Sequence, residues 1–100
     1  MIIVSGIQRL DPADLDRVRE AARAVIAATR EEQGCIVYSF AEDMVEPGLL
    51  RVYEEWETRE DLERHAKSDH VAAWRAALAS VEVLHRDLKI IEAGAVQPLG

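Results

Sequence analysis

The stretch from Cys35 to Phe40 is apolar at almost every position, and it constrains the fold more than any other part of the sequence. Successive side chains of an extended strand point to opposite faces, so Ile36, Tyr38 and Phe40 are predicted to share one face. Cys35 and Val37 would lie on the other face. Helices that cover one side of a sheet leave its other side exposed to water, and polar residues normally occupy that exposed side. We therefore expect the sheets of two identical chains to cover each other.

The remaining patterns predict the order strand, helix, strand, strand, helix, strand. Asp11 followed by Pro12 indicates the start of a first helix that runs to about Glu32, and Gly34 would end it. Thr58 would cap a second helix, which restarts near residues 67–70. The strands are expected at residues 2–7, 35–41, 49–56 and about 87–92. This order predicts an α+β, ferredoxin-like β-α-β-β-α-β fold with an antiparallel sheet.

The length of 100 residues, of which 49% are apolar, fits a single domain over residues 1–100. Residues 94–100, which include Pro98, are expected to form an irregular C-terminal tail. A chain of this size has one thin core, so a sizeable pocket should be scarce and shallow, or shared with a second chain.

The charge and cysteine content exclude several classes of protein. The formal net charge is -7 and the basic residues are mixed with acidic ones, which argues against nucleic acid as a partner. No stretch is long and apolar enough to span a membrane, and no signal-peptide core precedes the first strand, so the cytoplasm is the expected location. The single cysteine, Cys35, excludes an internal disulfide and any site of several cysteines.

Templates for metal and cofactor binding are absent from the sequence. His65 and His70 are five residues apart, which places them roughly 140° apart on an ideal helix, so they are not expected to bind one metal ion together. There is no glycine-rich phosphate loop and no dinucleotide-binding fingerprint. We therefore expect neither a metal nor another cofactor.

One carboxylate and one histidine are the candidate catalytic residues. Glu54 shares a strand face with apolar residues, so it is predicted to be partly buried and to need a partner. His65 lies on the inward stripe of the second helix and is the expected partner. Such a pair could perform acid-base catalysis. It could equally be a structural link between helix and sheet.

Four aromatic residues could bind a ligand. Tyr38 and Tyr53 could offer hydrogen bonds, and Trp56 and Trp74 could provide flat surfaces for an aromatic ring, although all four could instead belong to the core. Cys35 is expected to be a small core residue, because nothing near it in sequence would lower the pKa of its thiol. His70 and His85 are expected at the surface.

Three short motifs resemble one known family. They are E-x-x-G-C-x-x-Y from Glu31 to Tyr38, Y-E-x-W from Tyr53 to Trp56, and L-x-x-H from Leu62 to His65 followed by His70. This pattern is similar to that of the antibiotic biosynthesis monooxygenases, and with its flanking elements it covers essentially the whole chain. The resemblance implies a dimeric α+β barrel that oxygenates quinols or polycyclic phenols with O2 and without a cofactor.

The resemblance also suggests a role for each candidate residue. His65, oriented by Glu54, would take or share a phenolic proton; Tyr38 and Tyr53 would offer hydrogen bonds; Trp56 and Trp74 would contact the substrate ring. Two alternatives stay open: a noncatalytic dimeric module that binds a small ligand or another protein, and an isomerase that uses the same His65. Relatives that degrade haem use an asparagine, and this chain has none, which disfavours that activity.

Overall fold

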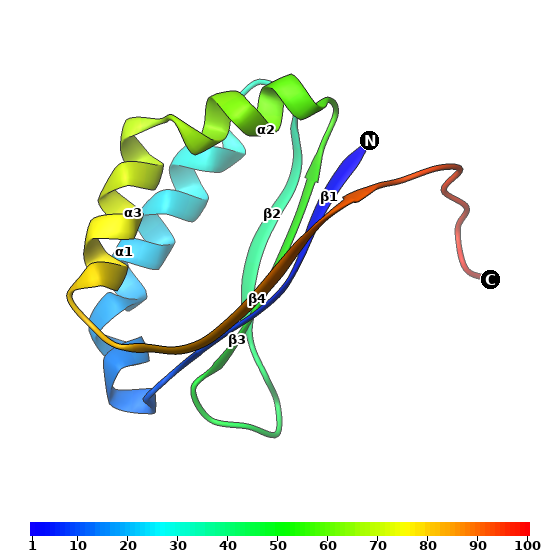
Figure 1. The fold of residues 1–100 in the computed structure, drawn as a ribbon. Coiled ribbons are helices and arrows are strands. Elements are labelled where there is room, and N and C mark those ends of the chain that lie inside the picture. The colour runs from blue at the N-terminus through cyan, green and yellow to red at the C-terminus, as the bar shows by residue number, and fades with distance from the viewer.

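The computed structural model describes all 100 residues and confirms the ferredoxin-like α+β fold. Its single antiparallel sheet has the strand order β2-β3-β1-β4, and the helices lie on one face of it (Figure 1). The elements are β1 (Ile2–Leu10), α1 (Pro12–Arg30), β2 (Cys35–Glu42), β3 (Leu49–Trp56), α2 (Arg59–Ala66), α3 (Asp69–Ala79) and β4 (Val83–Glu92). The first and last strands in the sequence, β1 and β4, are longer than predicted.

The second helix of the prediction is two helices, separated at Lys67 and Ser68. Ser68 Oγ donates a hydrogen bond to the carbonyl of His65 at 2.7 Å and accepts one from the backbone N–H of Val71 at 3.3 Å. The same side chain therefore satisfies backbone groups at the end of α2 and at the start of α3, as a capping residue does. The break changes the direction of the chain before His70.

The predicted faces of β2 were wrong at the start of the strand, because the strand has a β-bulge there. Cys35 is paired with Trp56 and Val37 with Glu55, so Ile36 is the extra residue. Ile36 is consequently exposed instead of sharing the inner face with Tyr38, while Cys35 packs against the core. The alternation of side chains along a strand predicts faces correctly only where the pairing is continuous.

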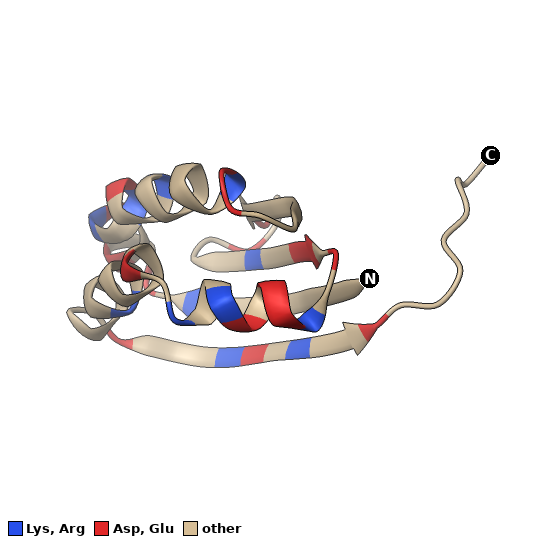
Figure 2. Cartoon of the chain, turned by 90° about the horizontal axis from the view of Figure 1, so that it is seen from above, with Lys and Arg blue, Asp and Glu red and all other residues tan.

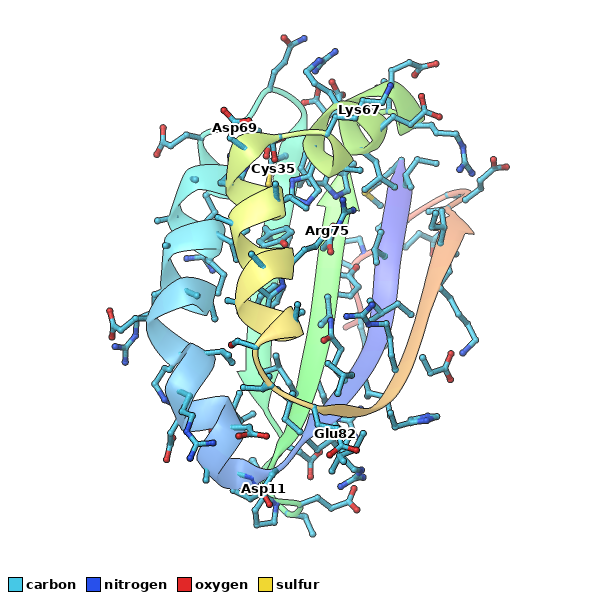
Figure 3. The ribbon with its side chains drawn as sticks, turned by 60° about the vertical axis from the view of Figure 1, so that its left-hand side comes forward. Asp11, Cys35, Lys67, Asp69, Arg75 and Glu82 are labelled. Atoms are coloured by element: carbon cyan, nitrogen blue, oxygen red, sulfur yellow. The ribbon has the colours of Figure 1, made fainter.

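The helices cover the sheet unevenly. Helices α1 and α3 pack against each other, and β4 at the sheet edge extends beyond them (Figure 1; Figure 3). Leu88 and Ile90 of β4 are exposed, although their partners Gly6 and Val4 in β1 lie on the face below the helices. Residues 93–100 form no helix or strand and project away from the sheet, and Val96 and Leu99 in them are exposed (Figure 2).

Charged residues are spread over the molecule. Acidic and basic positions alternate along the helices and along β4, without a continuous basic surface (Figure 2). No helix combines the length and the apolar composition needed to cross a membrane.

Candidate functional site

A cavity of about 480 Å³ lies between the inner face of the sheet and helices α2 and α3. This volume is in the range of small-molecule sites, and one chain supplies it alone. Most of its wall is apolar, including Val4, Phe40, Val52, Trp74, Leu78 and Leu88. Its polar groups are few: the buried side chains Gln8, Glu54 and His65, and charged residues that include Arg75 and Arg86. Arg75 extends from α3 toward the sheet (Figure 3).

His65 occupies the last turn of α2 and is buried, with 5% of its surface exposed. Its ring packs on two aromatic rings of the sheet: the centroid distance is 5.1 Å to Tyr38, with an interplanar angle of 63°, and 4.7 Å to Trp56. These contacts fix the plane of the imidazole. Because His65 also lines the cavity, it presents a held imidazole to any ligand there.

The carboxylate partner of His65 is Glu32, not the predicted Glu54. His65 Nδ1 donates a hydrogen bond to Glu32 Oε1 at 2.9 Å. A carboxylate oxygen can only accept, so this contact keeps the proton of the neutral ring on Nδ1 and leaves Nε2 with a free lone pair. Burial lowers the pKa of His65, and its effect exceeds the opposing effect of the hydrogen bond and charge of Glu32. The ring is therefore neutral near pH 7 and can accept a proton at Nε2.

Glu54 is buried as predicted, but it has a different partner. Its Oε1 accepts a hydrogen bond from the indole N–H of Trp56 at 2.9 Å. Burial raises the pKa of Glu54, because removing the carboxylate from water disfavours its charged form. Glu54 also lines the cavity. It is thus a buried acid in the site, independent of the histidine.

The turn between α1 and β2 places Glu32 beside α2. Gly34 in this turn has a φ of +83°, and a Cβ on it would lie 2.1 Å from the carboxyl group of Asp61. Asp61 is itself fixed at the start of α2, where its backbone N–H donates to Thr58 Oγ1 at 3.1 Å and its carboxylate accepts from Thr58 Oγ1 at 2.9 Å. A glycine is required here for both conformation and space. The close approach brings the turn, with Glu32, against the helix that carries His65.

The expectation that His65 and His70 point apart was wrong, because the helix is broken between them. Their ring centroids are 6.0 Å apart, and His70 Nε2 contacts the same Glu32 Oε1. One ligand atom from each of Glu32, His65 and His70 lies within 4.8 Å of the others, a spacing that a divalent cation could use. The hydrogen bonds of Glu32 already join the three side chains. His70 is only partly exposed, with 27% of its side chain accessible, so it is not the surface residue expected.

The four predicted aromatic residues separate into two groups. Tyr38 and Trp74 line the cavity with His65 and Glu54, and burial raises the pKa of the Tyr38 phenol. Trp56 is fully buried below them and does not reach the cavity. Tyr53 lies on the opposite face of the sheet, where its hydroxyl donates to Glu55 Oε2 at 2.7 Å. The structure therefore brings Tyr38 and Trp74 into the site but neither Trp56 nor Tyr53.

Cys35 packs against the core as predicted, whereas two residues of the site were not predicted. Burial, followed by the charges of Glu32 and Glu54, raises the pKa of the Cys35 thiol, in accord with a core role. Sequence reasoning missed Glu32, which only the fold of its turn places at His65, and Gln8, whose position at the end of β1 was not recognised as part of a strand. The restart at residues 67–70 was a usable signal that His65 and His70 converge.

Comparison with known sequences gives a family match and one relative. The sequence model of the antibiotic biosynthesis monooxygenase family matches residues 1–77. An uncharacterized protein of Synechocystis is 30% identical over 69 residues, which are 69% of this chain. The matched region is 47% of that relative, so this chain spans about half of its length.

Comparison with solved structures finds the same fold in other proteins. A candidate antibiotic biosynthesis monooxygenase from Deinococcus radiodurans has a TM-score of 0.89 and 27% identity, with 100% of both chains covered. A conserved protein from Methanosarcina mazei has a TM-score of 0.85 and 23% identity over 93% of this chain and 92% of its own. At 23% identity, the similarity to the Methanosarcina mazei protein shows the fold alone. Because the family model matches more than half of the sequence, the chain belongs to the antibiotic biosynthesis monooxygenase family.

Proposed function

We propose that the protein is a cofactor-independent monooxygenase that oxidises a small phenol or quinol with O2. The observation that carries this proposal is the neutral imidazole of His65, which lines an apolar cavity and is held at Nδ1 by Glu32. A cavity of about 480 Å³ with a mostly apolar wall accommodates an aromatic substrate. An open cavity that reaches His65 is the feature that every catalytic alternative requires.

The chemistry needs a base and a dry, apolar container. Dioxygen is a spin triplet and reacts slowly with closed-shell molecules, whereas an electron-rich phenolate can transfer one electron to it. His65 Nε2 takes the phenolic proton, the phenolate reduces O2, and recombination forms a bond between a ring carbon and oxygen. Loss of water then leaves a quinone. One oxygen atom enters the substrate, the other leaves as water, and the substrate supplies all the electrons, so no external reductant is required.

The surrounding groups have separate tasks in this scheme. Glu32 keeps the proton on Nδ1 and stabilises the imidazolium that forms when Nε2 is protonated, as an acceptor that orients a catalytic histidine does. Trp74 and Phe40, whose ring centroids are 5.5 Å apart with an interplanar angle of 34°, offer a flat apolar wall for the substrate ring. Tyr38 packs against His65 and holds its ring at the cavity.

A homodimer is part of the proposal. On the sheet face away from the helices, Ile3 lies between Glu55 and Ile91, and Val37 pairs with the same Glu55 on its other side. Ile91 is 43% exposed. Burial of Ile3, Val37 and Ile91 against the same residues of a second chain would remove apolar surface from water, which favours association, while Glu55 keeps its hydrogen bond from the Tyr53 hydroxyl.

Oxygen consumption tests the proposed activity. Purified protein, freed of metals by dialysis against a chelator, is mixed with a panel of substituted hydroquinones and naphthols in an oxygen electrode. We expect consumption well above the autoxidation rate for at least one of them, and a fall of about a hundredfold or more in His65→Ala. His85→Ala is the matched control, because His85 is an exposed residue of β4 and should leave the rate unchanged.

Three results would contradict the proposal. Consumption no faster than autoxidation across the panel would favour the noncatalytic binding module. Full activity in a correctly folded His65→Ala variant would assign His65 to the structure rather than to the chemistry. Conversion of a substrate without any oxygen uptake would point instead to the isomerase.

A further inference from the structure

The cavity has a second polar end, and Gln8 forms it. Gln8 lines the cavity from β1 and only 4% of its surface is exposed. Its Oε1 is buried and has no hydrogen-bond partner. An unsatisfied buried acceptor is costly and uncommon in folded proteins, and turning the amide over would bring this oxygen to the cavity side, where a ligand can complete it.

Arg86 lies next to Gln8 and is also without a partner. The two residues are paired across β1 and β4, and both line the cavity. Arg86 is exposed, and its guanidinium forms no hydrogen bond or ion pair, unlike Arg59, which contacts Glu92 at 3.1 Å. Gln8 therefore brings an amide to the cavity wall that can present its oxygen there when turned over, and Arg86 offers donors and positive charge beside it.

The end formed by Gln8 and Arg86 is separated from the end formed by His65 and Glu54 along the direction of the strands. Val4 is paired with Glu54, whereas Gln8 is paired with Leu50, which precedes Glu54 by four residues in β3. At the usual rise of a β-strand this is about 13 Å between the two levels. The wall between them is apolar and includes Val52 and Leu88.

We infer that Gln8 and Arg86 form a specificity subsite for a hydroxyl or phenolate group at the end of the substrate remote from the reacting phenol. With the amide of Gln8 as it stands, a hydroxyl can accept from its Nε2, because Oε1 is the buried atom. With the amide turned over, the hydroxyl can donate its proton to Gln8 Oε1 and accept from the Arg86 guanidinium, so it satisfies both residues at once. The ligand is thus an elongated aromatic with oxygen substituents at both ends. This inference builds on the proposed function for the direction of the substrate, but ligand binding tests it without turnover.

Binding of stable quinones is the experiment. Anthraquinone carrying hydroxyl groups at opposite ends is compared with the analogue that carries only one, by quenching of tryptophan fluorescence, since Trp74 lines the cavity. Wild-type protein should bind the two-ended compound about tenfold more tightly, the effect of one net hydrogen bond. Gln8→Leu and Arg86→Met should lose this preference while keeping the affinity for the one-ended compound.

Controls separate the subsite from folding and from catalysis. Gln97→Leu, in the exposed tail, and Arg23→Met, on the surface of α1, should keep the wild-type preference. Gln8→Leu removes the unsatisfied acceptor, so it should melt at a temperature no lower than wild type. Equal affinity of wild type for both quinones, failure to bind either, or a preference that survives in Gln8→Leu would overturn the inference. A preference that depends on Gln8 in a protein without oxygen uptake would uphold the subsite and reject the proposed function.

Discussion

Glu32 Oε1 and His65 Nδ1 are 2.9 Å apart, although 33 residues separate them in the sequence. This contact joins the turn after α1 to the last turn of α2, at the edge of the cavity. It determines which nitrogen of His65 is free to act as a base.

Replacement of Glu32 by glutamine should slow oxygenation and move its pH dependence. Glutamine can still accept from Nδ1 but carries no charge, and the charge of Glu32 raises the pKa of His65. Activity requires neutral His65, so it rises with pH through this pKa. Without Glu32 the pKa falls, the rising limb should shift to lower pH, and the plateau rate should fall at least tenfold as imidazolium stabilisation is lost. Glu31→Gln, at an exposed position, is the control; a pH profile that coincides with wild type would contradict the role of Glu32.

Replacement of Glu54 by glutamine should stabilise the protein at neutral pH. The pKa of buried Glu54 is raised above its usual 4.5, so ionisation above that pH disfavours the folded state. Glutamine can keep the hydrogen bond from Trp56 without this cost. The gain in unfolding free energy, measured by denaturant titration, should be present at pH 7. It should vanish as the pH falls below about 4.5, where Glu54 is protonated in both the folded and the unfolded chain.

The same variant distinguishes Glu54 from Glu32 in catalysis. Glu54 contacts Trp56 and not His65, so Glu54→Gln should leave the pH limb assigned to His65 within a few tenths of a unit of its wild-type position. A shift as large as that of Glu32→Gln would restore the Glu54 and His65 pair predicted from the sequence.

The sequence predicted the fold because local signals and the global pattern agree. Asp11 caps α1 by accepting from the N–H of Ala13, Thr58 caps α2, and Leu50, Val52, Glu54 and Trp56 share the buried face of β3 as the alternation requires. The site was less predictable. The choice of Glu32 over Glu54 depends on the packing of a turn against a helix, and no spacing rule along one element contains that contact.

Errors at the site arose where an ideal element was assumed. The rotation per residue of an ideal helix separates His65 from His70, but Ser68 ends one helix and starts the next. The strict alternation of β2 placed Ile36 inside, but the bulge puts it outside. Tyr53 was correctly placed on a strand, yet its parity, opposite to that of Glu54, already indicated the far face of the sheet.

Replacement of Gly34 by alanine should destabilise the fold and disturb the site together. A positive φ costs an alanine about 1–2 kcal/mol, and the added Cβ would meet the Asp61 carboxyl group. Relief of that contact must move the turn that carries Glu32. We expect a lower melting temperature and a reduced oxygenation rate, whereas Gly94→Ala, whose Cβ meets nothing within 4 Å, should change neither.

Replacement of Ile91 by lysine should convert the proposed dimer into a monomer. Ile91 lies on the sheet face away from the helices, beside Ile3, and is 43% exposed in the single chain, so a lysine should be tolerated there when the chain is alone. In a dimer it would bring two like charges into an apolar interface, which opposes association. Sedimentation velocity should show a dimer for wild type and a monomer with unchanged circular dichroism for Ile91→Lys. Met44→Lys, in the exposed loop after β2, should stay dimeric, and a wild-type chain that sediments as a monomer at high concentration would rule out this interface.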